Sequence, residues 1–399
     1  SGWVGIVAAA LYIVSPYAMF YDRMALMDPY VVAFAVLLAV FSVQAARSGQ
    51  RLHAFYAGML LCAAVLGKAT GVMLFIVPLL ALLFLGKLSV RQRVLQAVVT
   101  FGTFAAFWGP FYVFLRWRGY SYFSTAQNVV GTTESTEMLE RVWYNLTSTD
   151  GIFALNVVYH GWLFVALVCV AVLYLLVVTW RRGLFLLGTL ALPLGGLLLF
   201  AEKLSPRYFH FHIPFAYLIL AVALITFGRL LNRRLRWPRA LPAGVVLLAW
   251  AVFVSLPFYD HYLRDPATLN VPRLDRLEYI ESDAAGFAIA ETVAFLQQEG
   301  AEIVVGWLAN CAALQIVAPD TLDVTCLPLT TDAAMQMQHM RHLREQADVT
   351  QPWLIYEPSA FTTLAGLSDR FAQVATFPRP NDRTRLIVFE YRTRKEPPP

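Results

Sequence analysis

The sequence predicts a polytopic α-helical membrane protein with a small α/β domain at its C-terminal end. Of its 399 residues, 58% are hydrophobic and 14% are charged, whereas a soluble globular domain has roughly 45–50% apolar and about 25% charged residues. Apolar runs of spanning length fill the chain up to Tyr259, and the remainder mixes polar and apolar residues. These observations exclude a single water-soluble domain, a disordered chain and a small disulfide scaffold.

Nine apolar segments are candidates for membrane spans, because a span needs about 20 mostly apolar residues. They cover residues 2–20, 29–46, 53–67, 70–86, 94–115, 161–180, 183–200, 211–230 and 241–259. The third and fourth segments are short and meet at Lys68. They form either two full crossings or a hairpin that enters the membrane part-way.

The charges in the loops predict the orientation of these spans. Four alternate connections carry Lys and Arg but no Asp or Glu, namely residues 47–51, 87–93, 181–182 and 229–239. Such loops face the cytoplasm, so we expect the N-terminal residue in the cytoplasm and everything after Tyr259 outside. The net charge of +5 is then explained by orientation and implies no nucleic-acid partner.

The segment after Tyr259 predicts a linker at 260–280 and an extracytoplasmic α/β domain at 281–399, which follow the membrane domain at 1–259. Residues 302–307, 322–327, 353–356 and 385–391 are typical of short strands, and residues 285–298 and 332–347 are typical of helices. Cys311 and Cys326 share this domain, either as a disulfide or as two free thiols. Cys62 and Cys169 lie in apolar segments, where we expect packing roles.

Three polar clusters interrupt the apolar chain on the predicted outer side, where polar groups mark candidate functional sites. In the first, Asp28 either caps the following helix with Arg23 as its salt partner or forms with Arg23 the wall of an outward-facing cavity. In the second, Lys68 lies between Gly67 and Gly71 and either snorkels to head groups or binds a phosphate.

The third cluster is residues 202–214, at the start of an apolar segment. It is either an aromatic belt with ordinary loop charges or an anion site in which Arg207 binds a phosphate through two hydrogen bonds. His210 and His212 are two residues apart and would point to different faces of a helix, so we expect no zinc site. A helix at 137–144 is expected to lie over a cavity mouth, and no nucleotide-binding loop or hydrolase motif occurs.

These stretches resemble motifs of a known membrane family. Residues 15–28 read SPYAMFYDRMALMD, residues 66–71 read LGKATG, and residues 206–214 read PRYFHFHIP. They are similar to the "SP…Y-S-R-x-A-L-x-D", "hxK-x-x-G" and "x-R-Y-L-L-P-x-x-P" motifs of polyprenyl- and dolichyl-phosphate-mannose protein mannosyltransferase-like enzymes. Residues 279–287 resemble a further motif of some bacterial members but lack its Gly-Trp-Pro part.

The resemblance implies a GT-C glycosyltransferase that moves a sugar from a polyprenyl-phosphate donor to an acceptor outside the cytoplasm, without a cofactor or metal. It implies that the donor is bound by Arg23, Lys68, Lys203, Arg207 and Tyr208, since fixed positive charge stabilises a departing phosphate. Asp28 would be an auxiliary carboxylate.

The same resemblance places the catalytic Asp in a first outer loop that this sequence does not contain, and we therefore expect two spans upstream of Ser1. The expected partners are the lipid-linked donor, membrane lipids and further membrane subunits. An alternative is a catalytically silent relative that serves as a structural subunit of a membrane complex. A secondary transporter is less well supported, because no repeat symmetry or mid-span charge is present.

Overall fold

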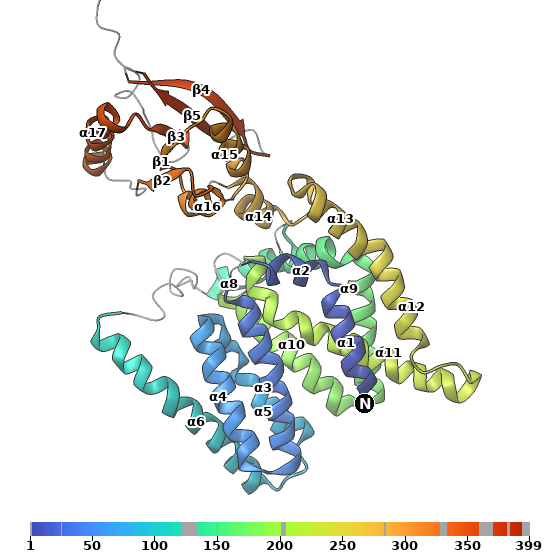
Figure 1. The fold of residues 1–399 in the computed structure, drawn as a ribbon. Coiled ribbons are helices and arrows are strands. Elements are labelled where there is room, and N and C mark those ends of the chain that lie inside the picture. The colour runs from blue at the N-terminus through green and yellow to red at the C-terminus, as the bar shows by residue number, and fades with distance from the viewer. Residues whose placement is uncertain are drawn as a thin grey trace, which may run out of the picture. The chain divides into compact units, whose positions relative to one another are not determined.

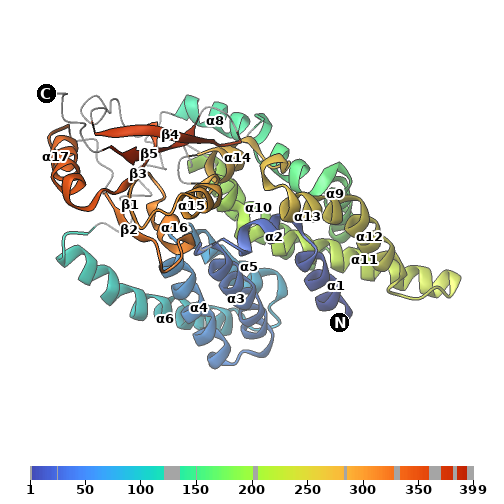
Figure 2. The same ribbon diagram turned by 45° about the horizontal axis from the view of Figure 1, so that its top comes forward.

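The chain divides into two units, Ser1–Pro272 and Arg273–Pro399, and the boundary falls within residues 260–280. The computed structural model describes residues 2–24, 26–120, 135–149, 151–200, 205–282, 285–327, 333–358, 370–380 and 384–392. Unit 1 is helical and is coloured blue through yellow in Figures 1 and 2, and unit 2 contains the sheet, in orange and red.

Unit 1 consists of α-helices joined by shorter 3₁₀-helices (η1, η3, η5) and π-helices (η2, η4). Its described elements are α1 (Gly2–Ile13), α2 (Pro16–Asp22), α3 (Asp28–Ser48), α4 (Arg51–Gly67), η1 (Ala69–Phe75), α5 (Ile76–Leu80), η2 (Ala81–Leu85), α6 (Val90–Trp117), α8 (Ser135–Thr147), α9 (Ile152–Val178), α10 (Trp180–Phe200), η3 (Pro206–His212), α11 (Ile213–Leu235), α12 (Leu241–Trp250), η4 (Ala251–Ser255), α13 (Leu256–Arg264) and η5 (Pro266–Thr268).

Among the described residues, six helical stretches are long and apolar enough to cross a membrane, or seven if the bent pair α1 and α2 is one span. The six contain α3, α6, α9, α10, α11 and α12. Apolar side chains on α6 face outward, and Val98, Val113 and Trp117 are 61%, 65% and 78% exposed. Exposed apolar surface of this kind is typical of helices that lie in a membrane or against a partner, so the helical unit has the composition of a membrane domain.

Several of the nine predicted segments are not single regular helices, and residues 241–259, for example, divide into α12, η4 and α13. Residues 2–20 divide into α1 and α2, whose axes differ by 67°. The break occurs because Pro16 has no amide hydrogen, while Ser15 begins a new helix by accepting the N–H of Ala18 through Oγ at 3.2 Å. Residues 70–86 divide into η1, α5 and η2.

The two ends of the helical unit differ in their loops. The end of α3 and the turn after it contact the start of α6 and the turn before it. Gln96 Nε2 of α6 donates to the Gly49 carbonyl at 2.6 Å, and the Lys87 amide donates to the Ala46 carbonyl of α3 at 3.3 Å. These turns contain the first two Lys/Arg-rich loops. Asp28 begins α3 and Lys68 follows α4, so both lie at the opposite end.

Unit 2 is an α/β domain. Its described elements are α14 (Arg273–Arg276), the π-helix η6 (Leu277–Glu281), α15 (Ile289–Gln298), β1 (Ile303–Trp307), α16 (Cys311–Val317), β2 (Asp323–Cys326), α17 (Ala333–Thr350), β3 (Trp353–Tyr356), β4 (Phe371–Pro378) and β5 (Arg385–Tyr391).

The five described strands form one mixed sheet in the order β2-β1-β3-β5-β4. Strand β1 is parallel to β2 and β3, whereas β5 is antiparallel to β3 and β4. Helices α15 and α16 cover the face that carries Val304 and Ile355, and α17 covers the face of Val305 and Leu354 (Figure 1). Neighbouring residues on a strand point to opposite faces, so both faces of the parallel part are buried.

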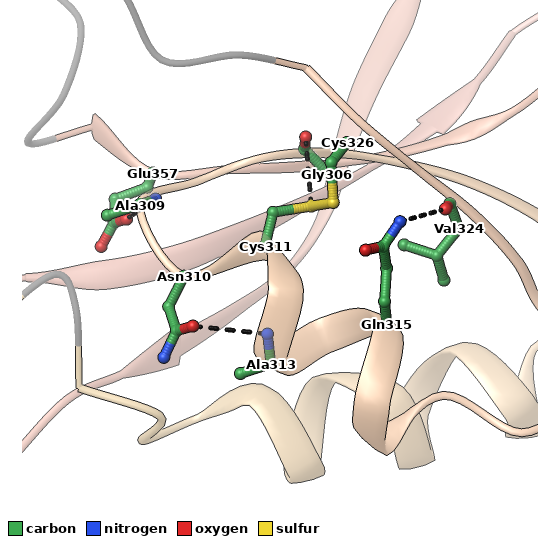
Figure 3. The surroundings of a disulfide bond; sticks show 9 residues. All are labelled: Gly306, Ala309, Asn310, Cys311, Ala313, Gln315, Val324, Cys326 and Glu357. Carbon is green, nitrogen blue, oxygen red and sulfur yellow. Dashed lines mark hydrogen bonds between the residues drawn. A yellow bond between two sulfur atoms is a disulfide. The ribbon is translucent and has the colours of Figure 1, made fainter. Parts of the chain in front are cut away.

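A disulfide joins Cys311, at the start of α16, to Cys326, at the end of β2 (Figure 3). Gly306 on β1 makes room for it, because a Cβ atom there would lie 2.5 Å from the Cys311 sulfur and 3.1 Å from Leu314. Asn310 caps α16 by accepting the Ala313 N–H at 3.3 Å. Of the two alternatives stated from the sequence, a disulfide or two free thiols, the structure therefore contains the disulfide.

Four described elements of unit 2 were absent from the sequence prediction, namely α14 and η6 in the predicted linker, and α16 and β4. Helix α16 has only seven residues, too few to show a helical period. Strand β4 changes register between Gln373 and Ala375, which disturbs the alternation that identifies a strand. The four predicted strands are present within two residues at each end, and the two predicted helices are present as α15 and α17.

Candidate functional site

Lys68 and Asp28 form an ion pair between Nζ and Oδ1. Asp28 is the first residue of α3 and Lys68 follows the last residue of α4, and these antiparallel helices bring the two side chains to the same end. The Lys68 side chain is 19% exposed and the Asp28 side chain 7%. The pair is therefore mostly buried but still reachable from one side.

A sharp turn holds Lys68 at this position. The Lys68 amide donates to the Ala64 carbonyl at 3.1 Å, and the Gly71 amide donates to the Lys68 carbonyl at 2.8 Å. A Cβ atom at Gly71 would lie only 2.4 Å from the Ala64 carbonyl oxygen. The glycine is required because η1 folds back directly against the end of α4.

A second cation, Arg207, contacts the same aromatic ring, Tyr208, as the Lys68 ammonium of the ion pair. The Lys68 ammonium lies 4.7 Å from the centre of the Tyr208 ring, and the Arg207 guanidinium lies 5.6 Å from the same ring. Both distances are within the range of a cation–π contact. The described part of this cluster thus has two cations and one carboxylate around one aromatic ring.

Two of the predicted site residues are not part of this cluster as described. Arg23 is exposed and places its guanidinium 5.6 Å from the ring of Tyr262 on α13. Of the two alternatives stated for Asp28, the one with Arg23 as its salt partner is wrong, because Lys68 takes that place. Lys203 lies outside the described residues.

A second polar cluster lies on the same 3₁₀-helix, η3, two residues further along. Oδ1 of Asp22 accepts the Tyr12 hydroxyl at 3.2 Å and lies 3.2 Å from Nε2 of His210. The Tyr12 hydroxyl is also 3.3 Å from the same nitrogen. Sequence reasoning missed this cluster, because it tested His210 only as a metal ligand and read Asp22 as an ordinary loop acid.

A buried chain of hydrogen bonds holds the bend between α1 and α2 beside this second cluster. The Tyr217 hydroxyl donates to Ser15 Oγ at 2.5 Å and lies 2.7 Å from His160 Nε2. The Tyr17 hydroxyl donates to the Pro206 carbonyl at 2.5 Å. These contacts tie α2 to α9, α11 and η3, so the position of Asp22 is fixed by the packed helices.

An apolar groove of about 920 Å³ begins beside Tyr12 and Asp22 of the second cluster. Its wall is formed mainly by α1, α3 and α11, with Phe185 of α10. Along α3 it extends from Pro29 to Gln44, a rise of about 22 Å at 1.5 Å per residue. Tyr12 and Asp22 line the groove at the Pro29 end. The groove therefore has the shape and composition for a long apolar chain with a polar group at one end.

No protein-family model matches this chain, and no curated protein sequence matches it either.

Proposed function

We propose that the chain is a membrane glycosyltransferase of the GT-C type that moves a sugar from a polyprenyl-phosphate donor to an acceptor on the extracytoplasmic side. The observation that carries the proposal is the pair of cations Lys68 and Arg207 on the Tyr208 ring, at the end of α3 where the apolar groove begins. A lipid-linked sugar phosphate would match this arrangement, because it has a long apolar chain for the groove and an anionic group for the cations.

The cations supply the electrostatic part of the reaction. When the bond between sugar C1 and the phosphate oxygen breaks, negative charge grows on the phosphate. Fixed positive groups placed beforehand stabilise that charge without having to reorganise. Asp28 is paired with the Lys68 ammonium, so we assign it the role of a counter-ion that gives way to the phosphate rather than that of the base.

The groove provides a place for the isoprenoid chain. Its apolar wall includes Ala8 of α1, Val36 and Val40 of α3 and Leu218 of α11. Burying isoprenoid units against these side chains contributes binding free energy along the whole length of the groove. Because the groove begins at Pro29, next to Asp28, a lipid lying in it would place its phosphate at the end of α3 where Lys68 lies.

The charge distribution supports an extracytoplasmic site. The first two Lys/Arg-rich loops lie at the end of the helical unit opposite Lys68 and Asp28, and such loops face the cytoplasm. The disulfide of unit 2 fits an oxidising compartment. Both observations favour a C-terminal domain outside the cytoplasm.

The test uses membrane vesicles that contain the full-length protein and its native acceptors. Radiolabelled polyprenyl-phosphate mannose is supplied, and label in the acceptor fraction is measured together with binding of polyprenyl phosphate. The variants are Arg207→Ala and the charge-neutral double variant Lys68→Met/Asp28→Asn, which avoids an unpaired buried carboxylate. The control is Arg182→Ala, which removes an exposed cation near the start of α10.

We expect each site variant to lose about 10- to 100-fold in binding, the range of one charge-assisted hydrogen bond, and the control to resemble the parent. Binding by both site variants at the parent's affinity would refute the phosphate site. Binding without sugar transfer in the parent would favour the catalytically silent subunit instead.

A further inference from the structure

We propose that the turn between α11 and α12 is a binding surface for the anionic head groups of membrane phospholipids. Residues 229–239 contain five arginines, which we call the arginine cluster: Arg229, Arg233, Arg234, Arg236 and Arg239. The other three Lys/Arg-rich connections, residues 47–51, 87–93 and 181–182, contain two, three and two cations. Two or three cations are thus enough for a connection of this kind, and the additional arginines need another explanation.

The arginine cluster is exposed and is not neutralised by the chain. All five side chains are exposed, and none forms a salt bridge with a residue that the structure describes. One of the five guanidinium groups makes a hydrogen bond within the described chain, from Arg239 Nε to Asn232 Oδ1 at 3.5 Å. In the second basic connection, by contrast, Arg93 donates to the carbonyls of Gly86 and Leu88 at 3.0 Å each. The arginine cluster therefore has free donors, whereas Arg93 uses its own donors to build a turn.

Backbone and side-chain contacts hold the turn between α11 and α12 in one conformation. Asn232 Nδ2 donates to the Trp237 carbonyl at 2.8 Å, and the Arg236 amide donates to the Asn232 carbonyl at 3.1 Å. A Cβ atom on Gly228 would lie 2.0 Å from the Arg239 carbonyl oxygen, so the chain returns directly against α11. This return brings the last arginine of the cluster back beside the first and concentrates the positive charge.

Arg236 has a backbone conformation that favours glycine. It ends α11 with a φ of 56°, in the left-handed region, just as Gly49 ends α3 with a φ of 68°. Glycine adopts this conformation without a steric penalty, whereas a residue with a Cβ atom is strained. Strain at a single residue is characteristic of functional sites. The end of the helix does not require a cation, so the arginine is better explained by what its side chain binds.

The length of α11 places the arginine cluster at the depth of lipid head groups. The helix has 23 residues and spans about 34 Å at 1.5 Å per residue, while the hydrocarbon layer is about 30 Å thick. It begins directly after η3, whose Tyr208 contacts Lys68. Its last turn therefore emerges at the membrane surface opposite the Lys68 site, and the cluster is separate from the proposed transfer reaction.

Exposed apolar side chains accompany the arginines. Leu235 is 53% exposed and Trp237 is 49% exposed, and in both views the turn between α11 and α12 projects beyond the neighbouring helices (Figures 1 and 2). Tryptophan is enriched at membrane interfaces, and an arginine beside it extends its head to the polar layer. A bilayer surface offers an apolar layer and a phosphate layer at this depth, whereas a soluble anion offers only the charge.

The chemistry of the arginines fits phosphate groups. A guanidinium group binds a phosphate through two parallel hydrogen bonds. Basic residues directly beside a membrane span attract anionic lipids, with a gain in affinity of about fivefold per residue near the surface. Five arginines held around one turn therefore favour anionic over zwitterionic lipid at this place.

The test uses Trp237 as a local reporter. Full-length protein is placed in phosphatidylcholine vesicles with a fixed fraction of either brominated phosphatidylglycerol or brominated phosphatidylcholine, since bromine quenches the fluorescence of nearby tryptophans. The difference between the parent and Trp237→Phe gives the quenching of Trp237 alone. We expect phosphatidylglycerol to be preferred about fivefold or more at 0.01 M salt, where the Debye length is about 30 Å, and less at 0.15 M, where it is about 8 Å.

Two variants reduce the charge of the arginine cluster. Arg236→Gly removes one cation and supplies the residue that the backbone favours, so the turn is retained. Arg233→Gln/Arg234→Gln removes two cations at the end of α11. We expect Arg236→Gly to lower the preference two- to fivefold and the double variant to lower it further. The matched control is Arg91→Gln, which removes an exposed cation from the second basic connection and should resemble the parent.

Three results would overturn the inference. Equal quenching of Trp237 by the two brominated lipids in the parent would exclude a lipid site and favour a soluble acidic partner. An unchanged preference in Arg236→Gly and in the double variant would show that the arginines do not bind the lipid. An equal loss in Arg91→Gln would mean that the total charge of this surface acts rather than the cluster. Polyprenyl phosphate binding should stay at the parent's level in every variant, which separates this inference from the proposed function.

Discussion

Each unit of the chain contains a buried ion pair, and the two pairs differ in how completely they are enclosed. In unit 1, the side chains of Lys68 and Asp28 are 19% and 7% exposed. In unit 2, Arg379 and Glu357 are both fully buried, and Glu357 also accepts the Ala309 N–H at 3.0 Å. The Arg379–Glu357 pair, called the enclosed pair below, is shielded on every side, whereas the Lys68–Asp28 pair, called the open pair, keeps part of its surface exposed.

The difference shows how one kind of interaction serves two purposes. Glu357 follows β3 directly, and its amide donates to the Trp307 carbonyl at the end of β1, so the enclosed pair ties the ends of the central strands to the segment before β5. The open pair lies next to Pro29, where the groove begins, and shares the Tyr208 ring with a second cation, Arg207. We therefore expect substitutions in the enclosed pair to change stability and those in the open pair to change ligand binding.

The largest effect is expected from breaking the enclosed pair on one side only. Arg379→Met leaves Glu357 as a buried charge without its cation, and such a change destabilises by about 3–5 kcal/mol. The free energy of opening of β1 and β3, measured by hydrogen exchange on the full chain, should fall by that amount. The double variant Arg379→Met/Glu357→Gln should recover most of it, and equal losses in both would contradict a structural ion pair.

The second-largest loss of stability is expected from removing the disulfide. Its two cysteines are 15 residues apart, and closing a loop of that length stabilises a fold by about 3 kcal/mol in the chain-entropy model. The variant Cys311→Ser/Cys326→Ser should therefore lower the opening free energy of β2 and α16 by about that value. The same measurement on the parent after reduction serves as a control, and no change in either would contradict this role.

In the open pair, we expect the Lys68 ammonium to exchange Asp28 for the phosphate when the lipid binds. Asp28→Asn removes a carboxylate that competes with a phosphate for the Lys68 ammonium, so polyprenyl phosphate should bind about three- to tenfold more tightly. Binding to vesicle-embedded protein is the measurement, with Asp260→Asn, which removes an exposed carboxylate on α13 that pairs with Arg264, as the matched control. Weaker binding in Asp28→Asn would mean that the carboxylate is needed to hold Lys68 in its binding position.

The smallest effect is expected at the aromatic ring between the two cations. Tyr208→Leu removes a cation–π contact of about 0.5–1 kcal/mol at a partly exposed site, which corresponds to roughly two- to fivefold weaker polyprenyl phosphate binding. Tyr208→Phe keeps the ring and should bind as the parent does. If both variants lose affinity equally, the hydroxyl group rather than the ring face is the important contact.

Sequence patterns predicted the helical segments well because their signal is local. An apolar run such as that of α3 is recognisable from its own residues, and Lys68 was recognisable as a break between two runs. The 67° bend after Ile13 was not, because Ser15 depends on contacts with Tyr217 and the bend is set by packing. Strand β4 was missed for a comparable reason, since its register shift depends on pairing with β5.

The candidate site was predicted in part. The sequence singled out Asp28, Lys68, Arg207 and Tyr208, and the fold brings them together. The pairing of Lys68 with Asp28 was not predicted, because neighbours in sequence suggested Arg23 instead. The contact between Asp22 and His210 depends on how α2 and η3 pack, and no spacing within either segment reports it.

The length of α4 sets how deep the open ion pair lies in a bilayer. Its 17 residues span about 26 Å at 1.5 Å per residue, while the hydrocarbon layer is about 30 Å thick. With Arg51 at one surface, Lys68 ends a few ångströms short of the other. If α4 crosses in this way, a thick bilayer would submerge the ammonium and a thin one would raise it to the head groups, so we expect lipid chain length to change how accessible the open pair is.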